Sequence, residues 1–136
     1  MPMELNELFH EAMPLCATLG MRAITWSPEL VEVEMDWAEE RCTSGGLLHG
    51  GAVMALADSA GGACASVNLP EGAVGTSTIE SKTNFLGAVR DGTVRASSRP
   101  LHIGSTTIVV ETEVRRRDGK LVAKTTQTQT VLRPKG

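Results

Sequence analysis

The sequence predicts an α+β fold in which one long central helix is wrapped by a curved antiparallel sheet, with a short helix at the N-terminus. Three observations favour it: a helix-forming segment at about 50–67, β-rich runs throughout the chain after residue 72, and turn signals that join those runs. Strands of about ten residues span roughly 33 Å, which is long enough to curl around one helix. The 136 residues fit a single domain, 1–136, that buries about two-thirds of its unfolded surface.

The first expected elements lie before residue 37. Across 3–17, apolar residues recur every three or four positions, as in a helix that packs by one face, and Pro14 should bend or end it. From Met21 the pattern becomes alternating. In 31–36, apolar residues alternate strictly with acids, which indicates a strand with one buried face.

The later strands are expected at about 74–86, 93–103, 106–114 and 121–132, which are rich in Thr and Val. Asp91-Gly92 and Asp118-Gly119 are hairpin turn signals, and the segment 102–104 marks another reversal or bulge. These connections predict an antiparallel meander.

Composition argues against several classes of partner. A formal charge of −3, two Trp, two Phe and no Tyr provide neither the clustered cations nor the stacking platforms that nucleic acids require. Three cysteines without CxxC or His/Cys clusters predict a reducing cytoplasm and no metal site. The N-terminus carries acids rather than the cations of an export signal, and the uncharged run 43–67 contains Asp58, so we expect no membrane span.

Asp58 is the only formally charged side chain between residues 43 and 67, and it lies in the middle of the expected central helix. A carboxylate in an apolar setting is costly unless it is hydrogen-bonded, is paired or lines a cavity. Two interpretations follow. Asp58 either faces solvent or bonds neighbouring backbone, or it is a general base or nucleophile beside a pocket of small residues.

The motif His49-Gly50-Gly51 lies where loop becomes helix, so the first free N–H groups there can hold a developing oxyanion. The plainer interpretation is that the glycines ease a tight turn and His49 packs or orients the loop. Gly50 and Asp58 are eight residues, or about 12 Å, apart along a helix. If they cooperate, two copies of the chain must set these helices antiparallel across a two-fold axis.

The segments LLHGGAVMALADSAGGA, TIESKTNFLGAV, DGTVRA and DGKLVAKTTQT together resemble the PaaI / 4-hydroxybenzoyl-CoA thioesterase branch of the hotdog-fold superfamily, over roughly 20–132. HGG, an acid nine residues after the histidine and an NFL segment after a strand are fairly specific in combination, although each alone is not. The resemblance implies a hotdog fold, a homodimer as catalytic unit, commonly a homotetramer, and coenzyme A thioesters as substrates. We expect no metal or redox cofactor, because the three histidines lie far apart in the sequence and no ligands cluster; coenzyme A is part of the substrate.

The resemblance also implies roles for individual residues. The catalytic acid falls on Asp58, the oxyanion N–H on Gly50 and the loop-orienting histidine on His49, with Gly51 beside them in the substrate-binding motif.

Two hydroxyl residues complete the implied site. The family's Thr or Ser that helps place water or substrate falls on Thr78, for which a simple β-branched strand residue is the alternative. Where the family often has Asn or Gln, six residues before the histidine, this chain has Thr43, whose hydroxyl substitutes only partly for an amide. Cations available for the coenzyme A phosphates are Arg90, Arg99, Arg115, Arg116, Arg117 and Lys120.

The sequence therefore favours an acyl-CoA thioesterase acting on aromatic or short- to medium-chain acyl groups, with Asp58 either deprotonating water or attacking directly to form a mixed anhydride. A non-catalytic acyl-CoA-binding hotdog module is the alternative. A hotdog hydratase or dehydratase ranks lower, because His49 followed by Asp58 is not the His/acid pattern usual in those enzymes.

Overall fold

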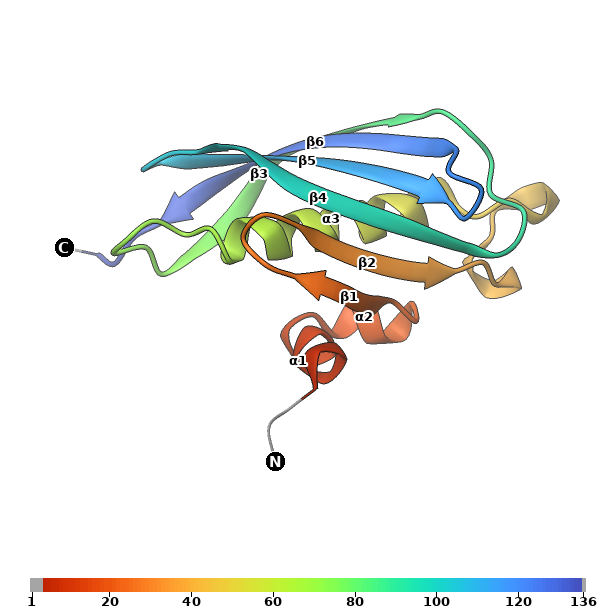
Figure 1. Ribbon diagram of the computed structural model, residues 1–136, viewed down its shortest axis with the longest axis horizontal. Helices are drawn as coiled ribbons and strands as arrows, with labels where there is room; N and C mark the ends of the chain where they lie inside the picture. Colours follow the sequence, from red (N-terminus) through yellow and green to blue (C-terminus); the bar gives the residue numbers. More distant parts are fainter. Residues whose placement is uncertain (1–3, 136) are drawn as a thin grey trace.

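A six-stranded antiparallel sheet curls around one long helix, α3 (Figure 1). The computed structural model describes residues 4–135. Its helices are α1 (Leu5–Ala12), α2 (Pro14–Thr18) and α3 (Gly50–Ser66), with short 3-10 turns at Glu39–Arg41 and Ser44–Gly46. Its strands are β1 (Arg22–Trp26), β2 (Val31–Asp36), β3 (Gly75–Phe85), β4 (Thr93–Ile103), β5 (Thr107–Arg116) and β6 (Leu121–Leu132). This α+β hotdog architecture confirms the predicted fold class.

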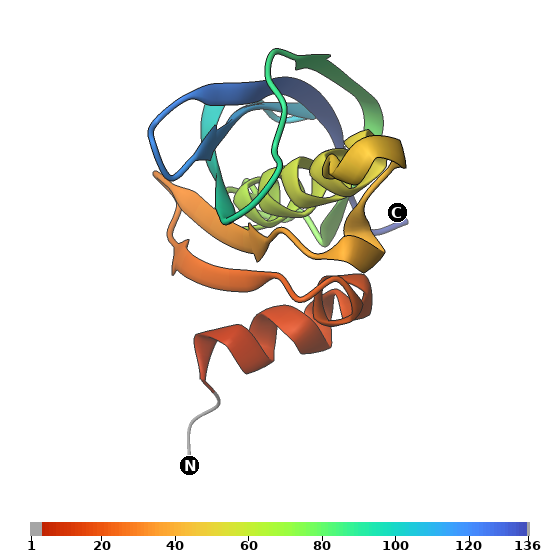
Figure 2. The same ribbon diagram turned by 90° about the vertical axis from the view of Figure 1, so that its right-hand side faces the viewer.

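The N-terminal helical segment is broken as its proline predicts. The chain leaves helical geometry at Met13, and Pro14 then occupies the first turn of α2, where its missing N–H does no harm. Both short helices lie below β1, on the outside of the curled sheet (Figure 2). Met3, near which the sequence places the start of this helix, lies outside the described residues.

The order of the strands is β1-β2-β4-β5-β6-β3, so only β4, β5 and β6 form the expected meander. Asp118-Gly119 joins β5 to β6 as predicted, and β4 turns into β5 after Ile103, with a bulge between Pro100 and His102. The expectation of a hairpin at Asp91-Gly92 was wrong. β3 pairs with β6 at the far edge of the sheet, and Gly92 (φ 73°) instead turns the chain into β4. A turn motif reports a local reversal and does not determine which strands pair.

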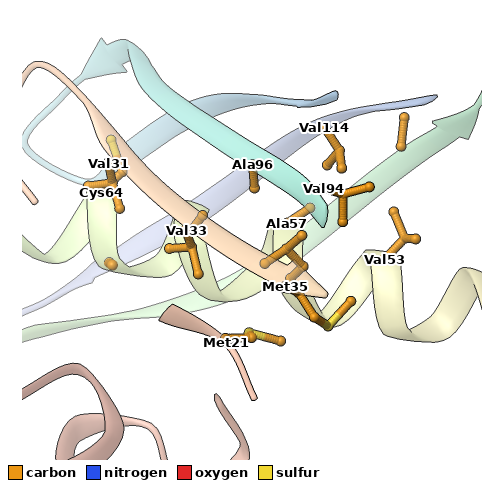
Figure 3. Close-up of a cluster of buried hydrophobic side chains, with 14 of the residues drawn as sticks. Met21, Val31, Val33, Met35, Val53, Ala57, Cys64, Val94, Ala96 and Val114 are labelled. Carbon is orange, nitrogen blue, oxygen red and sulfur yellow. The ribbon is translucent and has the colours of Figure 1, made fainter. Parts of the chain in front are cut away.

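The core lies between the inner face of the sheet and α3 (Figure 3). Val31, Val33 and Met35 point inward from β2, as their alternation predicts, and contribute to a cluster with Ala57 and Cys64 of α3. Alanines and glycines dominate the helix, and these small residues let the strands approach it closely. The described helices include none that is long and apolar enough to cross a membrane.

The sheet leaves one side of α3 open. Gly51, Met54, Asp58 and Ser66 are exposed along this side, whereas the rest of the helix is buried or half-buried. β3, at the edge of the sheet, is largely exposed on both faces, which is unusual for a strand eleven residues long. The open helix side and the bare edge strand are the setting of the candidate site.

Candidate active site

His49 caps the N-terminus of α3 with its imidazole. Its backbone is extended (φ −62°, ψ 133°), and Nδ1 accepts a hydrogen bond from the Gly51 N–H at 2.7 Å. Ser, Thr, Asp and Asn usually make this contact, and the histidine nitrogen performs the same task. As an acceptor, Nδ1 carries no proton, so the proton of the neutral ring is on Nε2. The Gly51 amide is therefore used within the cap, which corrects the expectation that it is one of the helix's free N–H groups.

The Gly50 amide is free. Ala52 and Val53 donate to the His49 carbonyl at 2.9 and 3.1 Å, and within residues 4–135 the Gly50 N–H has no acceptor. As the first residue of α3, Gly50 presents this donor at the positive end of the helix dipole. A single backbone N–H is thus available there for an oxyanion or carbonyl oxygen.

Thr43 and Gly50 line the same hollow, whose volume is about 340 Å³. Its other lining residues are Leu47, Leu48, Val53, Phe85, Gly87, Ala88, Val89 and Val122. Phe85, the aromatic residue of the NFL segment, packs so closely that a Cβ at Gly50 would lie 3.3 Å from its ring. The structure therefore brings together three sequence-predicted features, the HGG turn, Thr43 and NFL.

The loop before α3 is bent by two glycines in the left-handed region, Gly45 (φ 78°) and Gly46 (φ 74°). It is then held against the loop that follows β3 by a hydrogen bond from the Leu48 N–H to the Val89 carbonyl at 2.9 Å. This contact explains why residues 43 and 85–89, far apart in sequence, surround one hollow.

Asp58 lies on the open side of α3 and is exposed in the single chain, as the first of the two interpretations of this residue expects. The reason is that the sheet, closing around the helix, stops at β3 and leaves this side uncovered. The carboxylate is nevertheless partly enclosed by the protein. Burial raises the pKa of Asp58 above its ordinary value, and a hydrogen bond from Gln127 Nε2 to Oδ1, 3.1 Å long, opposes that rise.

Thr78 lies on β3 and is also held by a glutamine of β6. Gln129 Nε2 donates to Thr78 Oγ1 at 2.6 Å, while the Thr76 hydroxyl donates to Gln129 Oε1. Gln127 and Gln129 are both buried and lie two positions apart on one face of β6, a separation of about 7 Å. Asp58 and Thr78 are therefore held by neighbouring side chains.

Sequence reasoning missed both glutamines. The available signal was the alternation QTQT within a strand whose other inward positions carry apolar or small residues. A buried amide needs a hydrogen-bonding partner, so two glutamines on the buried face of a strand point to polar partners nearby.

A second hollow, also of about 340 Å³, lies beside His49 and Gly51. Leu15 and Leu19, at α2, line it together with Ala52 and Ala55 of α3 and residues 40–42. The second N-terminal helix, α2, therefore contributes an apolar wall next to the HGG turn.

Three of the predicted cations line one groove of about 590 Å³, namely Arg90, Arg116 and Arg117. Arg116 pairs with Asp118 at 2.7 Å and donates to the Ala88 carbonyl at 3.0 Å. Asp91 and Asp118 also line this groove, and because Ala88 lines the Gly50 hollow, the groove and the hollow adjoin each other.

Comparison with known proteins identifies the family. The family model described as "Thioesterase superfamily" matches residues 45–123. A protein of Saccharolobus solfataricus, provisionally named an esterase, is 36% identical over 132 residues, covering 96% of this chain and 92% of the relative. The 1,4-dihydroxy-2-naphthoyl-CoA hydrolase of Escherichia coli is 36% identical over 87 residues, covering 64% of this chain and 63% of that enzyme.

The fold supports the same assignment. The crystal structure of a thioesterase from Haemophilus influenzae superposes with a TM-score of 0.87 at 25% identity, covering 98% of this chain and 93% of that one. The residues matched by the family model, 45–123, include the HGG turn and Asp58 of this chain. The chain therefore belongs to the thioesterase superfamily of hotdog-fold thioester hydrolases.

Proposed function

We propose that this protein hydrolyses an acyl-CoA thioester to the free acid and coenzyme A, at a site shared by two copies of the chain. One observation carries the proposal: the free Gly50 amide and the Asp58 carboxylate belong to residues eight positions apart on the same helix, about 12 Å along its axis, so one chain holds two halves of a site. A two-fold axis beside the open side of α3 sets Gly50 of one copy opposite Asp58 of the other. The relationship to an aroyl-CoA hydrolase supports coenzyme A thioesters as the substrate class.

The bare edge strand β3 supports the dimer. Ile79 (62% exposed) and Phe85 (52% exposed) present apolar surface there, and the outer backbone groups of β3 lack a neighbouring strand among the described residues. Such an edge is a template for pairing with another chain. Pairing two β3 strands antiparallel covers the open side of α3 and brings Asp58 out of bulk solvent. A homotetramer built from two such dimers completes the proposed assembly.

In the proposed reaction, the thioester carbonyl accepts a hydrogen bond from the Gly50 N–H, and the dipole of α3 stabilises the oxyanion of the tetrahedral centre. Asp58 of the partner subunit either deprotonates the attacking water or attacks the carbonyl itself. In both routes the C–S bond breaks, and coenzyme A leaves as a thiolate that takes up a proton. In the first route the attacking water supplies the oxygen of the acid. In the second route water opens the mixed anhydride formed with Asp58, which releases the acid and restores the carboxylate. The proposal requires no metal or redox cofactor, because the acid and the amide supply this chemistry.

The remaining site residues position the substrate and water. Thr78, whose oxygen accepts from Gln129, retains its own proton to donate to water or substrate. Thr43 places a hydroxyl beside Gly50 in the same hollow, and His49 holds the turn. Gly51 stabilises the start of the helix, because its N–H donates to His49 and not to the substrate.

The two hollows and the groove lined by arginines are the proposed sites for the parts of an acyl-CoA. The Gly50 hollow leads to the groove of Arg90, Arg116 and Arg117, which we propose binds the coenzyme A phosphates. The apolar hollow beside His49 is the proposed acyl site, for an aromatic or a short- to medium-chain group. The free thiols of Cys16, Cys42 and Cys64 support a cytoplasmic location. We also propose that the chain forms a single hotdog domain of the PaaI / 4-hydroxybenzoyl-CoA thioesterase branch.

Thiol release tests the function directly. Purified protein incubated with a panel of aroyl-, phenylacetyl- and straight-chain acyl-CoAs is expected to release free coenzyme A with multiple turnovers, measured with a thiol reagent. Tight retention of intact acyl-CoA without thiol release would instead identify the non-catalytic binding module. Comparing kcat/KM across the panel determines the acyl preference.

The groove assignment predicts a change in KM alone. Replacing Arg90 and Arg117 by serine removes two cations that interact with phosphates, so KM for acyl-CoA is expected to rise about tenfold or more with kcat unchanged. The matching acyl-pantetheine, which lacks the nucleotide, should be hydrolysed equally by both proteins. Arg99→Ser, an exposed arginine of β4 outside the groove, is the control. If the double variant lost activity equally with acyl-CoA and with acyl-pantetheine, the phosphates would bind outside this groove.

A further inference from the structure

Gln127 is a buried amide with only one of its two polar groups in use. It lies in the middle of β6, is 1% exposed, and donates from Nε2 to Asp58 Oδ1 at 3.1 Å. Its Oε1 is buried and has no hydrogen-bonding partner within residues 4–135. An unsatisfied buried carbonyl destabilises a fold. Stability alone therefore does not account for a glutamine at this position.

Gly61 makes room for this amide. It lies three residues after Asp58, within the same turn of α3. A Cβ at Gly61 would overlap Oε1 of Gln127 and lie 2.8 Å from its Cδ. Glycine is a poor helix former, so α3 carries an unfavourable residue at the point where the amide enters. Two separately costly residues, one on the strand and one on the helix, thus combine to bring one N–H group to Asp58.

The other polar side chains on the inward face of β6 leave no hydrogen-bonding group unused in this way. Gln129 uses both amide groups, with Thr76 and Thr78, and the Thr125 hydroxyl pairs with Thr83 at 2.8 Å. Those contacts join β6 to β3 and support the sheet. The hydrogen bond of Gln127, by contrast, joins the sheet to the carboxylate on α3.

We propose that Gln127 is a positioning residue that holds the Asp58 carboxylate through Oδ1 and leaves Oδ2 for the reaction. The amide fixes the side-chain rotamer of Asp58, because Gln127 is itself immobilised between β6 and Gly61. The inference rests on the proposed function in one respect, namely that Asp58 is the reacting acid. The hydrogen bond itself is independent of that assignment.

The groups around Asp58 allow the effect of the Gln127 amide on the pKa of Asp58 to be measured. Burial raises the pKa of Asp58 and the Gln127 hydrogen bond lowers it, so removal of the amide should raise the pKa further. On α2, burial raises the pKa of the Cys16 thiol most, a hydrogen bond with Ser59 lowers it, and the nearby Asp58 charge raises it. The buried residues of β2, β4, β5 and β6 against α3 are uncharged. On β3, the two charged residues Glu80 and Lys82 stand opposite Thr128 and Thr126 of β6. These two threonines face outward.

The test compares two variants with a matched control. Gln127→Met keeps the length of the side chain and removes the donor, whereas Gly61→Ala retains Gln127 and displaces its amide. We expect each to lower kcat about 10- to 100-fold with little change in KM, as loss of a hydrogen bond to a charged group does. Each should also move the acid limb of the kcat/KM profile to higher pH. Thr125→Val removes a buried hydrogen bond on the same face of β6 and should lower stability without moving that limb.

Carboxyl NMR separates this inference from the proposed function. The ¹³C titration of Asp58 should shift to higher pH in Gln127→Met whether or not the protein is active. In the unmodified protein, the Gln127 side-chain amide signals should titrate together with the Asp58 carboxyl, which requires no variant to fold. An unshifted acid limb in Gln127→Met and Gly61→Ala, or amide signals that do not follow Asp58, would overturn the positioning role. Full activity of Asp58→Asn would instead overturn the proposed function and leave the NMR result standing.

Discussion

Asp58→Asn is expected to lower kcat by about 10²- to 10⁴-fold, the range associated with a positioned general base. Asparagine has nearly the same shape as aspartate and still accepts a hydrogen bond from Gln127 Nε2, but it neither takes a proton from water nor attacks the thioester. The measurement is steady-state thiol release with the preferred acyl-CoA. Binding of a non-hydrolysable acyl-CoA analogue should be retained, because the charge removed does not contact the phosphates.

The same variant should be more stable than the wild type at neutral pH. Burial raises the pKa of Asp58, so the folded protein binds this proton more tightly than the unfolded chain does. The charged form therefore destabilises the fold above the raised pKa, and this cost disappears as pH falls below the unfolded value. The stability difference between Asp58→Asn and wild type, measured by urea unfolding, should shrink on acidification through that window. Glu71→Gln, at an exposed acid in the loop after α3, should change neither stability nor activity.

Gly50→Pro is expected to lower kcat by about 10²- to 10³-fold, as the loss of one oxyanion-hole donor does. Proline is the only residue that removes a backbone N–H, and the first position of a helix is where proline is best tolerated. His49, the preceding residue, already has the extended backbone that proline requires before it (φ −62°, ψ 133°). The substitution therefore deletes the donor and keeps the helix start.

Gly50→Ala is the matched control. It adds a Cβ that would lie 3.3 Å from the Phe85 ring but retains the N–H, so its loss of kcat should be far smaller than that of proline. Circular dichroism is the check that both variants keep the helix. Equal losses in the two variants would show that space near Phe85 matters and that the amide does not.

The two inactive variants together test whether the site is shared. Mixing Asp58→Asn and Gly50→Pro chains under conditions of subunit exchange forms heterodimers in which one site carries both defects and the other carries none. Random exchange should restore about a quarter of the wild-type activity for a two-site dimer. No recovery, despite exchange verified by native mass spectrometry, would contradict a site built from two chains.

Much of the fold follows from local sequence pattern. The alternation at 31–36, the small-residue helix beginning at Gly50 and the Asp118-Gly119 turn all appear where expected. Each is a property of one segment, because side-chain periodicity reports which face of an element is apolar and turn residues report backbone geometry. The HGG turn and the position of Asp58 within the helix were readable for the same reason.

The tertiary structure decided which segments meet. Closing the sheet around α3 places β3 beside β6 rather than β4, and this pairing sets Thr78 against Gln129. It also leaves Asp58 on an open side and brings Gln127 to it, 69 residues away along the chain. These outcomes depend on contacts distributed over the whole core, each weak by itself, so no local pattern specifies them. The sequence therefore determined the elements and their reactive residues, and only their packing decided the partners that hold those residues.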